Sequence, residues 1–222
     1  MKHPQTQSKP EDLTLETLLR PYEQRIFITQ LIAAGVPQAS IDQMLTRPNS
    51  EDLLAWLYGD IEQNEARIIG GERQTRVVGV IITAGRQVLL ERDPDLGPDR
   101  LFAFGGQVRF DEDPAVAARR EIQEETSLIA TPEQLMLLSQ SQALGSESMK
   151  LPGVPARREI TQFLVRVAAF ADIPGQRSGI HRGSDGQRHE LLLLRIEDAL
   201  IDMRIQPAYR SALAAAMDQI RS

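Results

Sequence analysis

The hydrophobic pattern of this chain changes at Gly70-Gly71, and this change limits the folds open to it. Before this pair, from residue 11 to about residue 68, apolar residues recur at helical spacing and no strand signal is present. After it, the β-branched segment Val77–Ile82 predicts a strand, and strand and helix patterns then alternate to the end. We therefore expect a helical N-terminal extension over residues 1–70 and an α/β domain over residues 71–222.

The N-terminal part has local signals for three helices. A helical stretch from Tyr22 to Ala34 is closed by Gly35, Pro37 suits the first turn of a second helix, and Ser50 is a candidate N-cap of a third. We interpret this unit as a dimerisation or packing module, and a homodimer is the assembly expected from it.

The segment Ile28–Arg47 weakly resembles a helix-turn-helix, which keeps a nucleotide-sensing transcriptional regulator open as an alternative function. Residues 1–70 carry six Lys/Arg and ten Asp/Glu, a net charge of −4. This balance argues against a nucleic-acid partner, because binding to phosphates needs clustered positive charge.

Composition excludes several other classes of protein. The 222 residues carry a net charge of −6 and include no cysteine, so disulfides, thiolate nucleophiles and cysteine–zinc sites are excluded. No apolar run approaches the length of a membrane span, and we expect no membrane association. The polar start of the chain lacks the apolar stretch of an export signal, so the expected location is cytoplasmic.

The second part alternates strand and helix patterns. Besides Val77–Ile82, the expected strands are Gln87–Glu91, Leu101–Phe104, Ile160–Phe170 and Leu191–Ile196. Helices are expected from Pro114, capped by Asp113, and over Pro207–Ile220. Segments 144–157 and 173–189 are expected to be poor in regular structure.

Three carboxylates gather on one face of the expected helix after Pro114. Glu121, Glu124 and Glu125 stand at positions i, i+3 and i+4, which puts them within a sector of about 100°. Like charges this close repel one another, and a divalent cation would compensate them. Because the donors are oxygens with no cysteine or histidine beside them, Mg²⁺ or Mn²⁺ is favoured over Zn²⁺. A solvated acidic helix end is the simpler alternative.

The residues around these carboxylates follow a long fixed spacing. Gly106 is followed after five residues by Glu112, and after seven more by the segment 120–128, Arg-Glu-Ile-Gln-Glu-Glu-Thr-Ser-Leu. This pattern resembles the signature box of the Nudix hydrolases, with Ser127 in place of its final glycine. The resemblance covers residues 73–222. It implies an α/β/α sandwich with a mixed, curved sheet, to which the helical N-terminal extension is added.

The resemblance also implies an activity and its residues. The expected reaction is the Mg²⁺- or Mn²⁺-dependent hydrolysis of a pyrophosphate bond in a nucleoside diphosphate linked to another moiety. The metal-binding set is Glu121, Glu124, Glu125, a backbone carbonyl at Gly105-Gly106, and Glu112 as a supporting residue. Arg120 is expected to hold the carboxylates in place, with Glu124 and Glu125 taking part in catalysis.

The general base and the phosphate contacts stay open. Glu190, between the segment 173–189 and the strand after it, is the best distal candidate for the base, although a box glutamate is an alternative. His181 and His189 are weaker candidates. Four arginines are candidates to bind substrate phosphate: Arg157, Arg158, Arg182 and Arg188. No aromatic residue marks a pocket, and Gln142 and Leu144 stand at positions that distinguish subfamilies without matching one, so the substrate is open.

Overall fold

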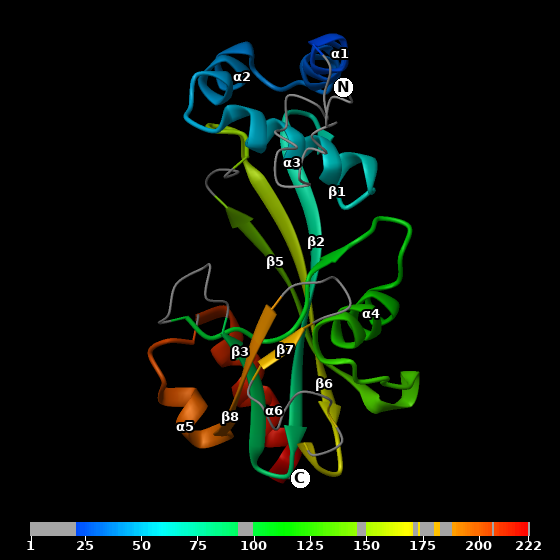
Figure 1. Cartoon of the computed structure of the whole chain (residues 1–222), viewed down its shortest axis with the longest axis vertical. Coiled ribbons are helices and arrows are strands. Elements are labelled where there is room, and N and C mark those ends of the chain that lie inside the picture. Colours follow the sequence, from blue (N-terminus) through cyan, green and yellow to red (C-terminus); the bar gives the residue numbers. More distant parts are fainter. Residues whose placement is uncertain are drawn as a thin grey trace, which may run out of the picture. The chain divides into compact units, whose positions relative to one another are not determined.

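A computed structural model describes residues 21–92, 100–145, 150–170, 173, 180–182, 188–205 and 207–221. The chain divides into two compact units (Figure 1). The first unit comprises Met1–Gln74 and Leu144–Arg157, and the second comprises Thr75–Ala143 and Arg158–Ser222. Within the described ranges, no helix is both long and apolar enough to cross a lipid bilayer.

The elements of the first part are the helices α1 (Pro21–Ala33), α2 (Gln38–Leu45) and α3 (Ser50–Glu62), and the strand β1 (Ala66–Ile69). The elements that follow are β2 (Glu72–Ala84), β3 (Gln87–Arg92), β4 (Gln107–Val108), α4 (Pro114–Thr126), the 3-10 turn η3 (Pro132–Gln134), β5 (Leu135–Gly145), β6 (Ala156–Arg166), β7 (Ile180–Arg182), β8 (Arg188–Arg195), α5 (Ile196–Ile201) and α6 (Pro207–Arg221).

One sheet of eight strands forms the framework, with the order β5-β6-β2-β3-β8-β7 and with β1 and β4 pairing with β2. The strands β2 and β3 form an antiparallel hairpin in which Ile82 pairs with Leu89. Leu101 adds a parallel bridge to Ile205. The expected mixed α/β fold is confirmed.

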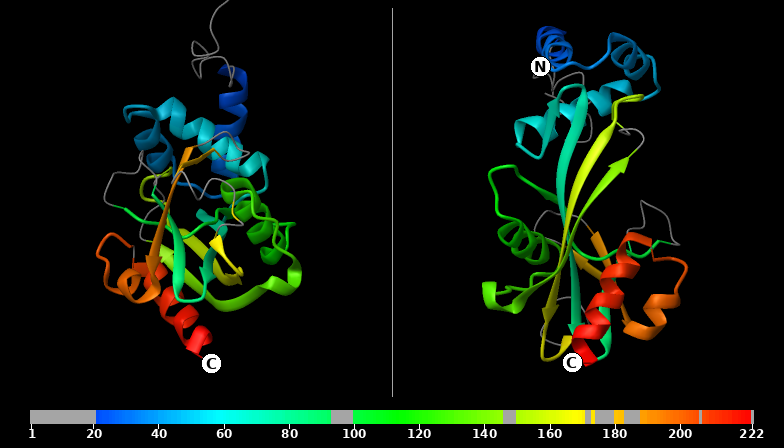
Figure 2. Two further views of the ribbon diagram at one scale, coloured as in Figure 1. Left: turned by 60° about the horizontal axis from the view of Figure 1, so that its bottom comes forward. Right: turned by 180° about the vertical axis from the view of Figure 1, so that it is seen from behind.

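Side chains alternate along the central strands between two apolar clusters, one on each face of the sheet. Along β2, Val80 and Ile82 enter the cluster that contains Ala118 and Ile122 of α4, whereas Ile81 enters the cluster that contains α5 and α6. This period of two is what a strand buried on both faces requires. Figure 2 shows α4 on one side of these strands and α6 on the other. The second unit is therefore a three-layer α/β/α sandwich.

The first unit has its own core, which is completed by residues from later in the chain. Phe27, Leu31 and Leu57 of the helices are buried together with Leu151 and Val154. The side chains of Leu151 and Val154 are both 0% exposed. Burial of large apolar side chains is the main favourable term in folding. The segment 150–155 has little regular structure, as expected, yet it supplies part of this core.

Charged groups also join this later segment to α3. The carboxylate of Asp60 accepts a hydrogen bond from Arg73 Nη2 at 2.6 Å and a second from Lys150 Nζ. All three residues are largely buried, so removal of Asp60 would leave two positive charges in the core without the carboxylate that both contact.

Two features near the unit boundary differ from expectation. Gly70 and Gly71, both at positive φ, form the turn of a hairpin between β1 and β2, so the strand pattern begins earlier than Val77. The start of β2 was not evident in the sequence because its buried positions, Arg73 and Thr75, are polar. Ser50 is the first residue of α3 rather than its cap, and the cap is Asn49 at φ 60°.

Several strands in the second unit also differ from expectation. β6 spans Ala156–Arg166 rather than 160–170, and β7 and the start of β8 lie in the segment 173–189 that was expected to be poor in regular structure. The expected strand Leu101–Phe104 is only a series of isolated bridges to Glu91, Val80 and Ile205, and β8 ends at Arg195 because α5 begins at Ile196. The strand β5 was missed because it has no β-branched residue, and it pairs with β6, where Ser139 Oγ donates to Gln162 Oε1 at 2.8 Å. The expected features over residues 1–20, 93–99, 174–179 and 183–187 lie outside the described residues.

We predict that Leu151→Ala lowers the free energy of unfolding of the first unit by about 2–5 kcal/mol, because it leaves a cavity in that core. Trp56 is the single tryptophan and lies on α3, so its fluorescence during urea unfolding reports on this unit alone. Leu144→Ala, at a side chain that is 74% exposed, is the matched control and should change the value by less than about 0.5 kcal/mol. Equal effects of the two variants would contradict the assigned core.

Candidate active site

The helix α4 carries the carboxylates, and its ends are fixed by local contacts. At the start, Asp113 Oδ1 accepts a hydrogen bond from the amide of Ala115 at 2.8 Å, and Pro114 takes the first helical position, as expected. At the end, Ser127 adopts the left-handed conformation (φ 60°, ψ 13°). This serine therefore adopts the conformation that favours glycine, at a cost of about 1 kcal/mol.

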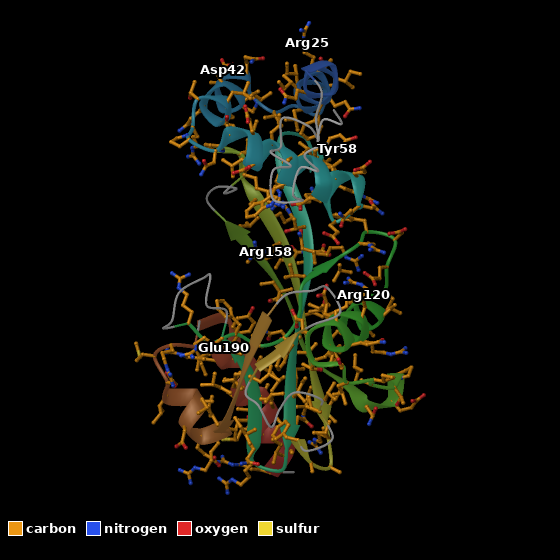
Figure 3. All side chains as sticks on the ribbon, viewed as in Figure 1. Arg25, Asp42, Tyr58, Arg120, Arg158 and Glu190 are labelled. Atoms are coloured by element: carbon orange, nitrogen blue, oxygen red, sulfur yellow. The ribbon has the colours of Figure 1, made fainter. Side chains whose placement is uncertain are left out.

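Arg120 brings three of the predicted carboxylates together. Its guanidinium contacts both carboxylate oxygens of Glu112 at 3.2 Å, Glu121 Oε1 at 2.7 Å and Glu124 Oε2 at 3.3 Å. A fifth bond runs from Nη2 to the carbonyl of Gln107 at 3.0 Å. Figure 3 labels Arg120 on α4. A planar guanidinium suits several carboxylates at once, which are the contacts expected of a residue that positions them.

These charges are largely withdrawn from water. The side chains of Glu112 and Glu121 are each 12% exposed, whereas that of Glu124 is 35% exposed. Burial alone would lower the pKa of Arg120, but its hydrogen bond to Glu112 and the charge of Glu121 raise that pKa above its ordinary value. Arg120 therefore stays charged at any pH at which the protein is folded.

Glu125 is held separately, by the backbone of the preceding turn. Its Oε2 accepts a hydrogen bond from the amide of Gly105 at 3.0 Å. The carbonyl of the neighbouring Gly106 accepts from the amide of Val78 on β2 at 3.0 Å, which leaves its second lone pair for another contact.

The two glycines of this turn are needed for different reasons. A Cβ on Gly105, which has φ +134°, would stand 2.2 Å from the carbonyl oxygen of Val78. A Cβ on Gly106 would stand 2.6 Å from the carboxylate of Glu121. The first glycine therefore permits the turn to lie against β2, and the second leaves room for a predicted metal ligand.

Sequence reasoning missed Arg76, which shapes the loop before α4. Its Nη1 donates to the carbonyls of Arg109 at 3.0 Å and Glu112 at 3.1 Å, across more than thirty residues of sequence. The amide of Arg109 also donates to Glu112 Oε2 at 3.3 Å. No local pattern could have indicated Arg76, since its partners are backbone oxygens of a distant loop.

The residues present fit a divalent cation in charge and donor type. Carboxylate and carbonyl oxygens are what Mg²⁺ and Mn²⁺ prefer, and Glu121 and Glu124 already converge on one positive group, Arg120 Nη1. In the described part of the chain, no three Asp, Glu, His or Cys side chains are grouped as a metal site. Glu125 is turned to Gly105 instead, so metal binding would need these side chains to reorient.

Glu190, the distal candidate for the general base, is not brought to this group of carboxylates. It lies on β8, opposite Arg92 of β3, and its Oε2 accepts a hydrogen bond from Arg92 Nε at 2.7 Å. Figure 3 shows it apart from Arg120. His181 and His189 pair in register across β7 and β8, and so do Arg182 and Arg188, but their side chains lie outside the described part.

The first unit carries no basic surface on the helix that would read DNA. Ile41 and Met44 point inward, as a helix-turn-helix would need, and Gly35 lies in the turn at φ +88°. The exposed side of α2 carries Gln38 and Asp42, which are joined by a hydrogen bond of 2.8 Å. The dimerisation role expected for residues 1–70 stays a prediction.

One family model matches more than half of this chain. The model of the NUDIX domain matches residues 73–208. No curated protein matches the chain.

Solved structures with a similar fold include the E. coli ORF135 protein, with 24% identity over 68% of this chain and 93% of that one, at a TM-score of 0.46. The E. coli dihydroneopterin triphosphate pyrophosphohydrolase has 22% identity over 62% of this chain and 91% of its own, with a TM-score of 0.47. A C. elegans Ap4A hydrolase has 19% identity over 66% of this chain and 98% of its own, with a TM-score of 0.40.

We predict that Gly106→Ala lowers the hydrolytic rate about 100-fold while the fold is retained, because the new methyl group displaces the carboxylate of Glu121. Gly105→Ala is the contrasting variant, since its methyl group meets backbone, and it should lower the free energy of unfolding by about 3 kcal/mol. Thermal melting and single-turnover rates separate the two effects. A Gly106→Ala protein with the wild-type rate would show that the position of Glu121 does not matter.

Proposed function

This chain belongs to the NUDIX family of pyrophosphohydrolases, and from that premise we propose that its substrate is a nucleoside diphosphate linked to another moiety, with Mg²⁺ or Mn²⁺ as cofactor. The observation that carries the proposal is the network of Arg120 with Glu112, Glu121 and Glu124, beside Glu125 on the amide of Gly105. Family members generally use divalent metal ions.

The residues that would hold the metal are Glu121, Glu124 and Glu125, with a carbonyl of the Gly105-Gly106 turn. A bound divalent ion supplies charge neutralisation at the pyrophosphate and a more acidic water. The chain's own part is to fix the carboxylates: Arg120 and Glu112 hold Glu121 and Glu124, and the amide of Gly105 orients Glu125. These contacts keep the carboxylates near one another, and the side chains of Glu121, Glu124 and Glu125 would turn from them to bind a metal.

The proposal predicts that a panel of nucleoside diphosphate derivatives with Mg²⁺ contains a substrate, and that Glu124→Gln and Glu125→Gln each lower its rate by at least about 1,000-fold. Both changes keep the shape of the side chain and remove its charge. Glu133→Gln, at a fully exposed carboxylate of the same unit, is the control and should keep the wild-type rate.

Metal binding has a readout that does not depend on the substrate. Mg²⁺ or Mn²⁺ at millimolar concentration should raise the melting temperature of the wild-type protein, because a ligand that binds only the folded state stabilises it. The increase should be smaller in the Glu124→Gln and Glu125→Gln proteins. Full activity of both variants would overturn the assignment of Glu124 and Glu125. If the protein hydrolyses no compound in the panel, the proposed substrate class is overturned.

We keep Glu190 as the proposed general base. To reach the attacking water it must leave its ion pair with Arg92 and approach the carboxylates of α4, and this ion pair gives a specific test. If Glu190 accepts the proton of the attacking water, Glu190→Gln should lower the maximal rate by about 10²–10⁴-fold and leave the Mg²⁺ dependence unchanged. Arg92→Met breaks the same ion pair but keeps the carboxylate, so it should have a much smaller effect on the rate. Equal losses would mean that the ion pair positions the strands, and an unchanged rate in Glu190→Gln would remove this residue from the site.

A further inference from the structure

The strand β5 ends the sheet on one side, and its outer edge is open. In the described part of the chain, β5 pairs with β6 alone and stands first in the strand order (Figure 1). The side chains of residues 140–144 are all exposed. An edge strand presents a row of backbone N–H and C=O groups to which a further strand can bind.

This edge lacks the features that normally prevent pairing. Proteins protect the edges of their sheets with short strands, charged side chains or proline. The strand at the other end of the order, β7, has three residues and includes Arg182. The strand β5 has eleven residues, Leu135–Gly145, with no charge and no proline, although a quarter of the whole chain is charged. It is therefore a long edge that is free to pair.

The first half of β5 also exposes apolar side chains. Met136 is 39% exposed and Leu137 is 53% exposed, although both lie in a regular strand of the sheet. Exposed apolar side chains on an unprotected edge are typical of an interface with another chain. The residues that follow, Ser139, Gln140 and Ser141, are polar and uncharged, so they can be covered without burying a charge.

The sequence of β5 suits pairing with an identical strand. In an antiparallel pair with Gln140 opposite Gln140, each residue faces the one that lies equally far beyond this centre. The pairs formed in this way are Ser139 with Ser141, Leu138 with Gln142, and Leu137 with Ala143. Hydroxyl groups meet next to the centre, and the exposed Leu137 meets an apolar side chain at each end. Because no residue is charged, like charges do not face each other anywhere along the pair.

We propose that two copies of this chain form a dimer in which the segments 137–143 of β5 pair antiparallel about Gln140. Such an interface is two-fold symmetric, because the same edge serves both copies. Seven residues on each strand give about seven backbone hydrogen bonds over about 24 Å, a number within the range of specific protein interfaces. The two sheets then continue into each other. This interface does not involve residues 1–70, and it is independent of the proposed substrate.

Sedimentation of the full chain measures the assembly, and charges introduced at the centre test the pairing. At micromolar concentration the wild type should sediment as a dimer with twice the chain mass of 24.8 kDa. Gln140→Lys and Gln140→Glu each place two like charges opposite each other, so each should raise the dissociation constant of the dimer about 5- to 10-fold at low ionic strength. Gln30→Lys, at an exposed residue of α1, makes the same change of charge and should leave the dimer intact.

A mixture of the two variants gives the most specific test of the proposed centre. When Gln140→Lys and Gln140→Glu proteins are combined, the introduced lysine of one copy faces the introduced glutamate of the other. The mixture should therefore form dimers at least as tightly as the wild type does, at concentrations at which each variant alone dissociates. Only a pairing that brings residue 140 of both copies together predicts this recovery.

Several results would overturn the proposal. A wild-type protein that sediments as a monomer at micromolar concentration would do so, and so would a dimer that Gln140→Lys does not weaken, since its interface would lie elsewhere. An equal loss in Gln30→Lys would indicate a general effect of charge or an interface on the N-terminal helices. Two dissociated variants that do not recover on mixing would contradict the centre at Gln140. Because Gln140 is exposed, the variants should keep the circular dichroism spectrum of the wild type, which shows that the fold is retained.

Discussion

The close approach of the Gly105-Gly106 backbone to β2 on one side and to α4 on the other is the constraint on which the site depends. Gly105 has no space for a side chain because the carbonyl of Val78 fills it, and Gly106 has none because Glu121 does. The turn is therefore a spacer without side chains between the sheet and the acidic helix. The amide of Gly105 donates a hydrogen bond to Glu125, and the carbonyl of Gly106 accepts one from Val78 of β2.

The acidic face of α4 is stable without a metal because one cation is built into it. Arg120 is in contact with Glu112, Glu121 and Glu124, so the repulsion expected among clustered carboxylates is offset within the protein. This arrangement has a chemical consequence. A divalent ion would compete with the guanidinium for Glu121 and Glu124, and Glu112 would keep Arg120 in place while they turn.

Local chemistry made the helix α4 and its caps predictable, because Asp113, Pro114 and Ser127 act within a few residues of their own backbone. The strand over Val77–Ile82 was predictable from its own β-branched residues. What escaped prediction depends on distant partners: Arg76 on the loop before α4, and the burial of Leu151 with the N-terminal helices. The strand β5 was also missed, because its pairing with β6 rather than its own composition makes it a strand.

The insertion of Leu151 and Val154 into the core of the N-terminal helices has a consequence for biosynthesis. The ribosome releases α1, α2 and α3 first, then the whole acidic segment of α4, and only afterwards the residues that complete the first core. Contacts between such distant residues must await closure of a long loop, which slows folding. The three helices therefore cannot complete their core until Val154 has been synthesised. They emerge with an apolar surface still uncovered, and they depend on the second half of the chain to bury it.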